Sequence, residues 1–352
     1  MQKNHYSQTE TPVFSKFFGN LADGNEVLLF TLRNKNGAEL SVMNYGATIT
    51  SLKIPISETK KLDVVLGFDT LEDYLYSFDL ASAPYFGTTV GRFAGRINNA
   101  KFSLNETQIH LNKNHGNHNI HGGNSGFSRK FWKVISTSNT DNPSITFRYI
   151  SENNEENFPG ELAINVTYTL SDNNELIVEY FAISTEDTIV NCTQHSYFNL
   201  DGQADAVTNQ TLFVNSKQIL ETTSENIPTG NFVNLNDHKF DFSIPKKAPD
   251  QIDNTFVLEN NNEVKAFLFS EKNKLKMSVF TNQPAVHIYV GGYCSDEIKG
   301  KENTNYHAQS GICFETQKYP DAPNHSHFPS AVLKKGETYH HKTTFKFENI
   351  EL

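Results

Sequence analysis

The sequence predicts an all-β protein, folded as one large antiparallel β-sandwich with few short helices. Short apolar runs in which hydrophobic and polar residues alternate recur to the end of the 352-residue chain, and this period of two is typical of half-buried strands. Polar turns separate the runs, and no helical period extends over about ten residues. Many strands at short spacing are typical of a sandwich or barrel.

The first elements follow each other closely. Residues 27–32 predict a strand that ends at the polar turn 34–37, and residues 40–55 form a long β-prone run interrupted at 44–47. A buried strand is expected at 62–66. Thr70 then offers an N-cap with acidic residues in the following turn, which predicts a short helix.

Hairpins dominate the remainder of the chain. The clearest joins residues 163–170 and 175–183 around a polar turn. The same pattern predicts strands at 99–104, 107–111, 131–135, 145–150, 265–269, 274–280, 286–290 and 338–347. A further strand begins at Ile312, with Ile312 and Phe314 on one face and Cys313 and Glu315 on the other.

Residues 16–352 are expected to form a single domain after a flexible N-terminal segment, residues 1–15. No Ser/Gly/Pro linker or internal repeat divides the chain. The N-terminus has no apolar run of signal-peptide length, and no stretch of about 18 apolar residues occurs. We therefore expect a cytoplasmic protein and, by default, a monomer.

Charge and cysteine content exclude several classes of function. A net charge of −10 argues against nucleic acid and anionic membranes as partners, because both are bound through basic surfaces. The three cysteines are odd in number and widely spaced. They predict neither a disulfide framework nor a zinc site.

Two polar clusters lie in glycine-rich segments. Residues 91–97 carry Arg92 and Arg96, whose guanidinium groups are rigid forks of hydrogen-bond donors, although solvated surface charges explain the pattern equally well. Residues 115–123 carry three histidines, the last of which is His121. Because no Cys or carboxylate is interleaved with them, we favour His121 as a pocket residue over a metal ligand.

Three further clusters lie in β-like segments. His195 lies in the aromatic stretch 191–200, where a satisfied core histidine is the common case. Asp253 opens 253–256, and an Asx-turn is the simplest explanation of that sequence. Glu315 stands where a strand gives way to a loop, a favourable place for chemistry, although a lone Glu is usually an exposed surface residue.

These clusters indicate the class of ligand. The chain has no P-loop, dinucleotide fingerprint or GxSxG elbow. A His, a Glu, an Asp and an Arg on separate segments, with Tyr and Phe nearby, suit a neutral polyhydroxylated ligand. Charged groups bind its hydroxyls, and aromatic rings cover its C–H surfaces.

The ordered motifs resemble those of the aldose 1-epimerases, the galactose mutarotases. The resemblance runs from residue 18 to the C-terminus, and its segments are NYGA at 44–47, VLGF at 65–68, Gly87 with 91–97, IHGG at 120–123, HSYFNL at 195–200, DNTF at 253–256 and ETQ at 315–317. It implies a galactose mutarotase-like β-sandwich that interconverts the α and β anomers of aldohexoses such as glucose and galactose.

The resemblance also implies roles for individual residues. Glu315 corresponds to the general base and His195 to the general acid. The residues matched to sugar binding or to the pocket wall are Arg96, His121, Tyr197, Asp253 and His287. Two positions depart from the family pattern, with Gly95 where Asn is frequent and His287 where some members have Gln. Both departures concern the sugar contacts and leave the acid–base pair intact.

Mutarotation needs no redox step, so we expect no required cofactor and no catalytic metal. Acidic loops leave a bound calcium ion open, although no EF-hand-like loop occurs. Two alternative functions remain. One is a carbohydrate-binding module, which needs no acid–base pair, and the other is a hexose-6-phosphate 1-epimerase, in which Arg92 and Arg96 would bind the phosphate.

Overall fold

The computed structural model describes residues 13–261, 263–291 and 299–350. Within them the strands form three larger sheets and four two-stranded ribbons, and the named strand pairs are antiparallel. The prediction of an all-β antiparallel sandwich with few short helices is confirmed. Cys294 lies outside the described residues.

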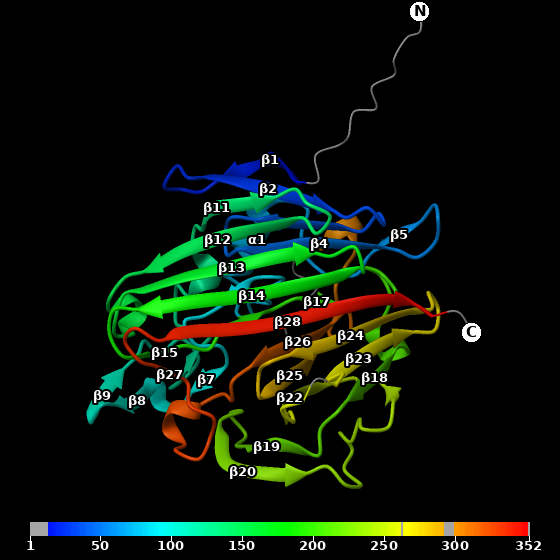
Figure 1. Cartoon of the computed structure of the whole chain (residues 1–352). Helices are drawn as coiled ribbons and strands as arrows, with labels where there is room; N and C mark the ends of the chain where they lie inside the picture. Colours follow the sequence, from blue (N-terminus) through cyan, green and yellow to red (C-terminus); the bar gives the residue numbers. More distant parts are fainter. Residues whose placement is uncertain (1–12, 262, 292–298, 351–352) are drawn as a thin grey trace, which may run out of the picture.

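The largest sheet has nine strands and runs across the front of Figure 1. In spatial order its members are β11 (Lys133–Ser138), β12 (Ser144–Ser151), β13 (Leu162–Leu170), β14 (Glu175–Ser184), β28 (Thr338–Asn349), β24 (Leu275–Thr281), β23 (Ala266–Ser270), β18 (Thr211–Val214) and β21 (Lys246–Lys247). The hairpin predicted at 163–183 forms its centre as β13 and β14.

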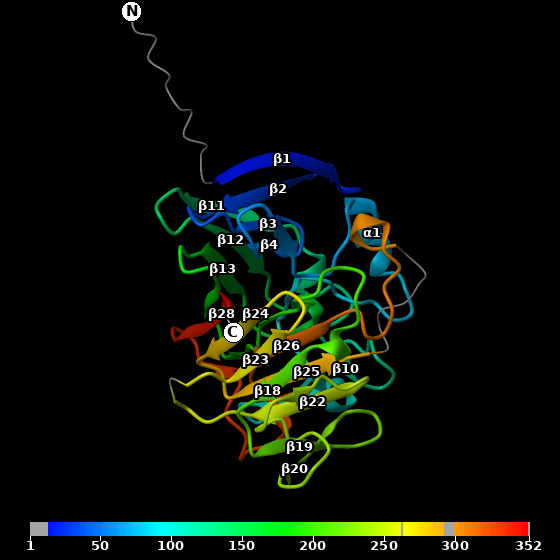
Figure 2. The ribbon, with the colours of Figure 1, turned by 90° about the vertical axis from the view of Figure 1, so that its right-hand side faces the viewer.

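A six-stranded sheet packs behind the nine-stranded one. Its order is β17 (Tyr197–Phe198), β26 (Ile312–Gln317), β25 (Ala285–Val290), β22 (Ile252–Val257), β19 (Gln218–Thr222) and β20 (Pro228–Asn234). In the side view of Figure 2, β24 and β28 lie on one side and β22, β25 and β26 on the other.

A five-stranded sheet covers one end of the sandwich. It is a meander of β1 (Val13–Asn20), β2 (Glu26–Arg33), β3 (Glu39–Met43), β4 (Thr48–Pro55) and β5 (Lys61–Asp63). The boundary predicted after residue 15 falls inside β1, and residues 1–12 are not described. The strand predicted at 62–66 ends at Asp63, because the Leu66 N–H leaves this sheet and donates to the Tyr197 carbonyl at 2.9 Å.

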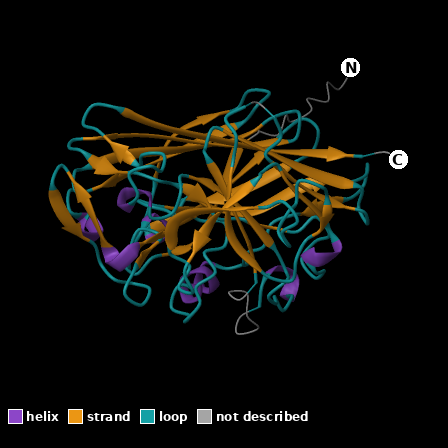
Figure 3. Ribbon diagram, turned by 90° about the horizontal axis from the view of Figure 1, so that it is seen from below, coloured by secondary structure: helices purple, strands orange, loops and turns teal. Residues whose placement is uncertain are grey.

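Short ribbons and helices complete the chain, and the helices lie at the margins of the strands in Figure 3. The ribbons pair β6 (Thr89–Val90) with β16 (Thr193–Gln194), β7 (Arg96–Ile97) with β10 (Asn119–Ile120), β8 (Lys101–Leu104) with β9 (Thr107–His110), and β15 (Thr188–Ile189) with β27 (Val332–Leu333). Helix α1 (Leu71–Ser77) begins at the predicted cap, where the Thr70 side chain accepts the Asp73 N–H. The 3-10 turns are η1 (Asn98–Ala100), η2 (Phe127–Arg129), η3 (Glu155–Asn157), η4 (Val207–Asn209), η5 (Lys301–Asn303) and η6 (Ala322–Asn324).

The main core lies between the two largest sheets. Along β13 every second residue is fully buried, as a period-two strand requires. From the opposite sheet, Phe314 packs near Phe198, whose ring centroid lies 4.9 Å from that of Phe345 on β28. One face of β26 therefore points into the core, and its other face is free to build a site.

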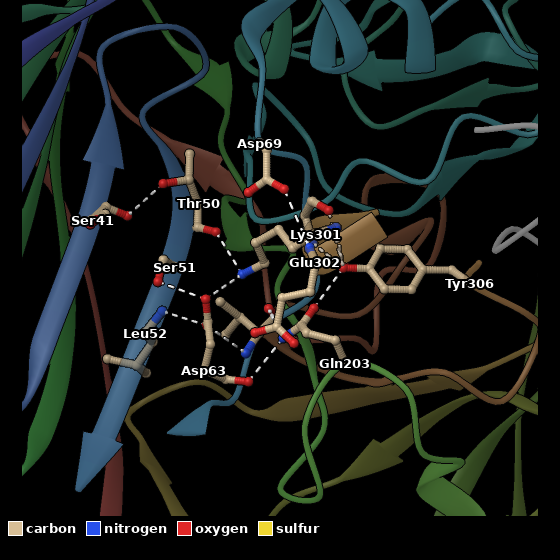
Figure 4. Close-up of polar contacts among 12 residues, drawn as sticks. Ser41, Thr50, Ser51, Leu52, Asp63, Asp69, Gln203, Lys301, Glu302 and Tyr306 are labelled. Atoms are coloured by element: carbon tan, nitrogen blue, oxygen red, sulfur yellow. Dashed lines mark hydrogen bonds and ion pairs between the residues drawn. The ribbon is translucent and has the colours of Figure 1, made fainter. Parts of the chain in front are cut away.

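A polar network joins three segments that are distant in the sequence (Figure 4). Lys301 Nζ contacts Asp63 Oδ2 at 2.7 Å and donates to the Thr50 carbonyl at 2.9 Å. The hydroxyl of Tyr306 donates to Gln203 Oε1 at 2.6 Å, and Gln203 donates to the Asp63 carbonyl at 2.9 Å. The network fixes the segment around 301–306 against the five-stranded sheet.

None of the helices within residues 13–261, 263–291 and 299–350 combines the length and apolar character needed to cross a membrane.

Candidate active site

The floor of the site is the outer face of the six-stranded sheet. Glu315 on β26 lies opposite His287 on β25, which lies opposite Thr255 on β22. Opposite residues of antiparallel strands share a face, as do residues two apart along one strand. The pairing therefore brings Glu315, His287 and Asp253 to one side, with Cys313 two residues before Glu315.

His195 lies over this floor, between β16 and β17. Its N–H donates to the Thr88 carbonyl and its own carbonyl accepts the Gly87 N–H, both at 2.9 Å. Its Nε2 lies 3.5 Å from Glu315 Oε1, and the two side chains are only 6% and 4% exposed. A rigid backbone thus holds an imidazole and a carboxylate beside each other in a nearly enclosed place.

Arg96 comes from the β7–β10 ribbon, where it pairs with Ile120, and His121 directly follows that ribbon. The Gly95 N–H donates to His121 Nδ1 at 3.3 Å, which leaves Nε2 of the neutral ring as the N–H donor. Burial, followed by the positive charges of His195 and Arg96, holds the pKa of His121 well below its usual value. His121 is therefore a neutral donor at physiological pH.

Gly95 has a structural reason to be glycine. Its φ of +80° is in the left-handed region, and a Cβ at this position would lie 3.0 Å from two atoms of the Pro320 ring. At this departure from the family pattern, the backbone N–H of Gly95 is the group that orients His121.

Asp253 and His287 form a half-buried pair. His287 Nε2 lies 2.9 Å from Asp253 Oδ1, and Asn226 donates to Asp253 Oδ2 at 2.8 Å. Burial alone would raise the pKa of Asp253, but the hydrogen bond and charge of His287 hold it below its usual value. Burial would likewise lower the pKa of His287, but Asp253 and then Glu315 raise it. Each member of the pair thus favours the charged form of the other.

One cavity of about 280 Å³ unites these groups. The structure places all seven predicted site residues in its lining: Arg96, His121, His195, Tyr197, Asp253, His287 and Glu315. Asp253 is on strand β22 and not in the Asx-turn that its sequence favoured. The buried state of Glu315 and His195 likewise excludes the interpretation of Glu315 as an exposed surface residue.

The cavity also contains residues that the sequence analysis did not select. Tyr289 and Gln317 follow His287 and Glu315 by two positions. Because residues two apart on a strand share a face, the alternation of the sequence could have predicted both. Tyr85 reaches the site from a loop, with its ring 5.1 Å from that of His121 and 6.0 Å from that of His195. No sequence pattern marks Tyr85.

Arg92 does not line the cavity, which argues against the alternative in which it binds a phosphate together with Arg96. Its guanidinium is buried and donates to the carbonyls of Pro159 and Gly160 at 2.9 and 2.8 Å and to Ser151 Oγ at 2.6 Å. These contacts bind the loop after β12, and the cavity lining includes Arg96 but not Arg92. Five rigid donors suit this role as well as they suit a phosphate.

A group of metal-ligating residues also falls within the cavity. In the part of the chain that the structure describes, His121, His195 and Glu315 are the group of His, Cys, Asp or Glu whose ligand atoms come within 4.8 Å of one another. The other two histidines of the 115–121 cluster are not members. Because the Gly95 N–H donates to His121 Nδ1, the proton of the neutral ring is on Nε2, and neither nitrogen then offers a free lone pair to a metal ion.

Comparison with known proteins identifies relatives along almost the whole chain. The sequence pattern of the family described as aldose 1-epimerase matches residues 28–346. Galactose mutarotase of Bos taurus is 36% identical over 319 residues, which are 88% of this chain and 90% of the relative. Aldose 1-epimerase of Haemophilus influenzae is 33% identical over 348 residues, or 94% and 98% of the two chains.

Solved structures agree with these relatives. An aldose epimerase homologue from C. elegans superposes with a TM-score of 0.83 at 29% identity, covering 92% of this chain and 99% of that one. A galactose 1-epimerase from Lactobacillus acidophilus has the same TM-score at 24% identity. At this lower identity, the second structure shows a similarity of fold alone.

Proposed function

The chain belongs to the aldose 1-epimerase family, and we propose that its cavity interconverts the α and β anomers of aldohexoses such as glucose and galactose by acid–base ring opening. The observation that carries the proposal is the contact between Glu315 and His195 over a sheet floor that also carries Asp253 and His287. The protein is thus an isomerase of the mutarotase type, and its partner is a small-molecule sugar.

Glu315 acts as the base and His195 as the acid in the opening step. The carboxylate of Glu315 takes the proton of the C1 hydroxyl while Nε2–H of His195 protonates the ring oxygen. The electron pair of the C1–ring oxygen bond moves to that oxygen, and the C1–O bond becomes a carbonyl. Each proton transfer contributes typically about 10²–10⁴-fold when the group is within hydrogen-bond reach.

Ring closure on the other face completes the reaction. The open chain rotates about the C1–C2 bond, so that the opposite face of the aldehyde meets the hydroxyl. His195, now neutral, takes back the hydroxyl proton, and Glu315 returns its proton to the carbonyl oxygen. Both residues regain their starting states, so the cycle balances without a cofactor.

The remaining groups hold the sugar. Arg96 and His121 donate hydrogen bonds to hydroxyl oxygens, and Asp253 accepts hydrogen bonds from hydroxyl groups. Tyr197 supplies an aromatic wall for C–H surface. His287 orients Asp253 through their 2.9 Å contact and lies opposite Glu315 on the neighbouring strand.

We further propose that the protein is a cytoplasmic monomer that needs neither nucleic acid nor membrane. The net charge of −10 supports this exclusion, because it repels nucleic acid and anionic membranes. Two buried cysteine side chains that form no disulfide, Cys192 and Cys313, are consistent with a reducing compartment.

Polarimetry with freshly dissolved sugars tests the function. The protein is expected to accelerate the approach of α-glucose and α-galactose to anomeric equilibrium well above the buffer rate. Binding of these sugars without acceleration would instead indicate a carbohydrate-binding module. A strong preference for glucose 6-phosphate would indicate the hexose-6-phosphate enzyme, a result we do not expect because Arg92 is occupied by backbone carbonyls.

A further inference from the structure

The two ring nitrogens of His195 face different surroundings. Nε2 is directed at Glu315 Oε1, 3.5 Å away in the cavity. Nδ1 lies 3.7 Å from Cys313 Sγ, on the buried side of the ring. This distance lies within the range of an N–H···S hydrogen bond, and the Cys313 side chain is fully buried.

The proposed reaction makes a demand on Nδ1. His195 gives and takes its proton at Nε2, so its second proton must stay on Nδ1 in both halves of the cycle. A neutral imidazole carries one proton on either nitrogen, and the hydrogen bond at one nitrogen decides which tautomer is present. An acceptor facing Nδ1 is therefore needed to keep Nε2 available.

We propose that Cys313 is a positioning residue of the reaction: its sulfur accepts the Nδ1–H of His195 and holds the ring in the tautomer whose Nε2 faces Glu315 and the sugar. The proposal rests on the acid role of His195 given above. Cys313 does not touch the substrate and acts through His195.

Strand geometry explains why the sulfur is in the right place. Cys313 and Glu315 are two residues apart on β26 and share a face. Cys313 also pairs across the ladder with Tyr197 and Tyr289, which fixes its position from both sides. One strand thus presents both the base and the group that orients the acid.

The rings of three other residues pack around His195. His121 and Tyr85 meet it from neighbouring loops with ring centroids 5.5 and 6.0 Å away, and Tyr197 packs on it at 5.3 Å. The carboxylate next to His195, Glu315, is on the Nε2 side. A neutral sulfur at Nδ1 orients the ring without adding a second negative charge.

The pH dependence of kcat separates this role from a packing role. Cys313→Ala removes the acceptor and leaves the imidazolium less stable, so the limb of the profile that reports His195 should move to lower pH by about 0.5–1 unit. The same variant should lower kcat by about tenfold, because the ring then loses its fixed tautomer. Cys313→Ser restores an acceptor and should return both quantities close to the native values.

Cys192→Ala is the matched control, because Cys192 is an equally buried cysteine away from the cavity. It should leave the profile unchanged even where it lowers the melting temperature. Equal profiles for native protein and Cys313→Ala would overturn the proposal, as would the same shift in Cys192→Ala.

A spectroscopic measurement reads the tautomer without any turnover. In protein carrying ¹⁵N-labelled histidine, the His195 ring signals are assigned by their absence in His195→Gln. The neutral native ring should carry its proton on Nδ1, and Cys313→Ala should lose this preference. A native ring protonated on Nε2 would refute the proposal. If His195→Asn and Glu315→Gln both kept native activity, the catalytic assignment itself would be refuted. That result is distinct from a failure of the proposal for Cys313.

Discussion

The buried Lys301–Asp63 pair gives a quantitative prediction about stability. The two side chains are 7% and 8% exposed, and Lys301 Nζ lies 2.7 Å from Asp63 Oδ2. Lys301→Met removes the cation and leaves the carboxylate buried, a change that costs about 3–5 kcal/mol. Asp63 keeps donors from the Ser51 hydroxyl at 2.7 Å and the Leu52 N–H at 3.0 Å. We therefore expect a loss near the lower end, about 3 kcal/mol.

Urea denaturation followed by circular dichroism measures this loss. The control is Lys53→Met on β4, which changes an exposed lysine and should alter the free energy of unfolding by no more than about 0.5 kcal/mol. Adding Asp63→Asn to Lys301→Met should recover part of the loss, because the unpaired charge is then gone. A Lys301→Met protein as stable as Lys53→Met would refute the view that this pair anchors the segment.

Three further outcomes are expected. Burial lowers the pKa of His341 from 6.5 to about 3. Between these two pH values the unfolded chain binds a proton that the folded chain does not, so the free energy of unfolding should fall by up to about 1.4 kcal/mol for each pH unit below 6.5. His341→Gln should flatten this pH dependence, and an unchanged slope would contradict the assignment. Asp253→Asn should lower kcat/KM by about 10–100-fold, mainly through KM, because a charged acceptor for hydroxyls is lost; an effect on kcat alone would disagree. Gly95→Ala and Gly336→Ala both place a side chain at positive φ, and each should lower the free energy of unfolding by about 1–2 kcal/mol. Only Gly95→Ala should also impair mutarotation, because it disturbs the contact between the Gly95 N–H and His121.

Local patterns predicted much of the fold. The β13–β14 hairpin follows from strict alternation around a polar turn, and Thr70 capped a helix because its side chain satisfies an orphan N–H. Strands β18 to β20 escaped prediction because their residues do not alternate clearly between apolar and polar types. The segment after Asp63 also differed, because the Leu66 N–H donates to Tyr197 of the six-stranded sheet, a contact that the sequence does not reveal.

The site was predictable where chemistry and period coincide. The resemblance assigned Glu315 and His287 to one site, and the pairing of β25 with β26 brings the two side chains together. Arg92 shows the limit, since the same guanidinium serves a phosphate or a set of carbonyls, and only the folded position of residues 151–160 decides between them. The approach of Cys313 to His195 is likewise a three-dimensional fact, because 118 residues separate the two in sequence.

The rate of anomer exchange in Glu315→Gln tests the central claim most directly. Magnetisation-transfer NMR on galactose measures this rate in a protein whose fold and sugar binding are checked in parallel. Gln keeps the shape of Glu315 but cannot accept the C1–OH proton, so the rate should fall by about 10²–10⁴-fold, while Glu26→Gln, an exposed change on β2, leaves it unaltered. Exchange within a few-fold of native in folded, sugar-binding Glu315→Gln would contradict the assignment of Glu315 as the base.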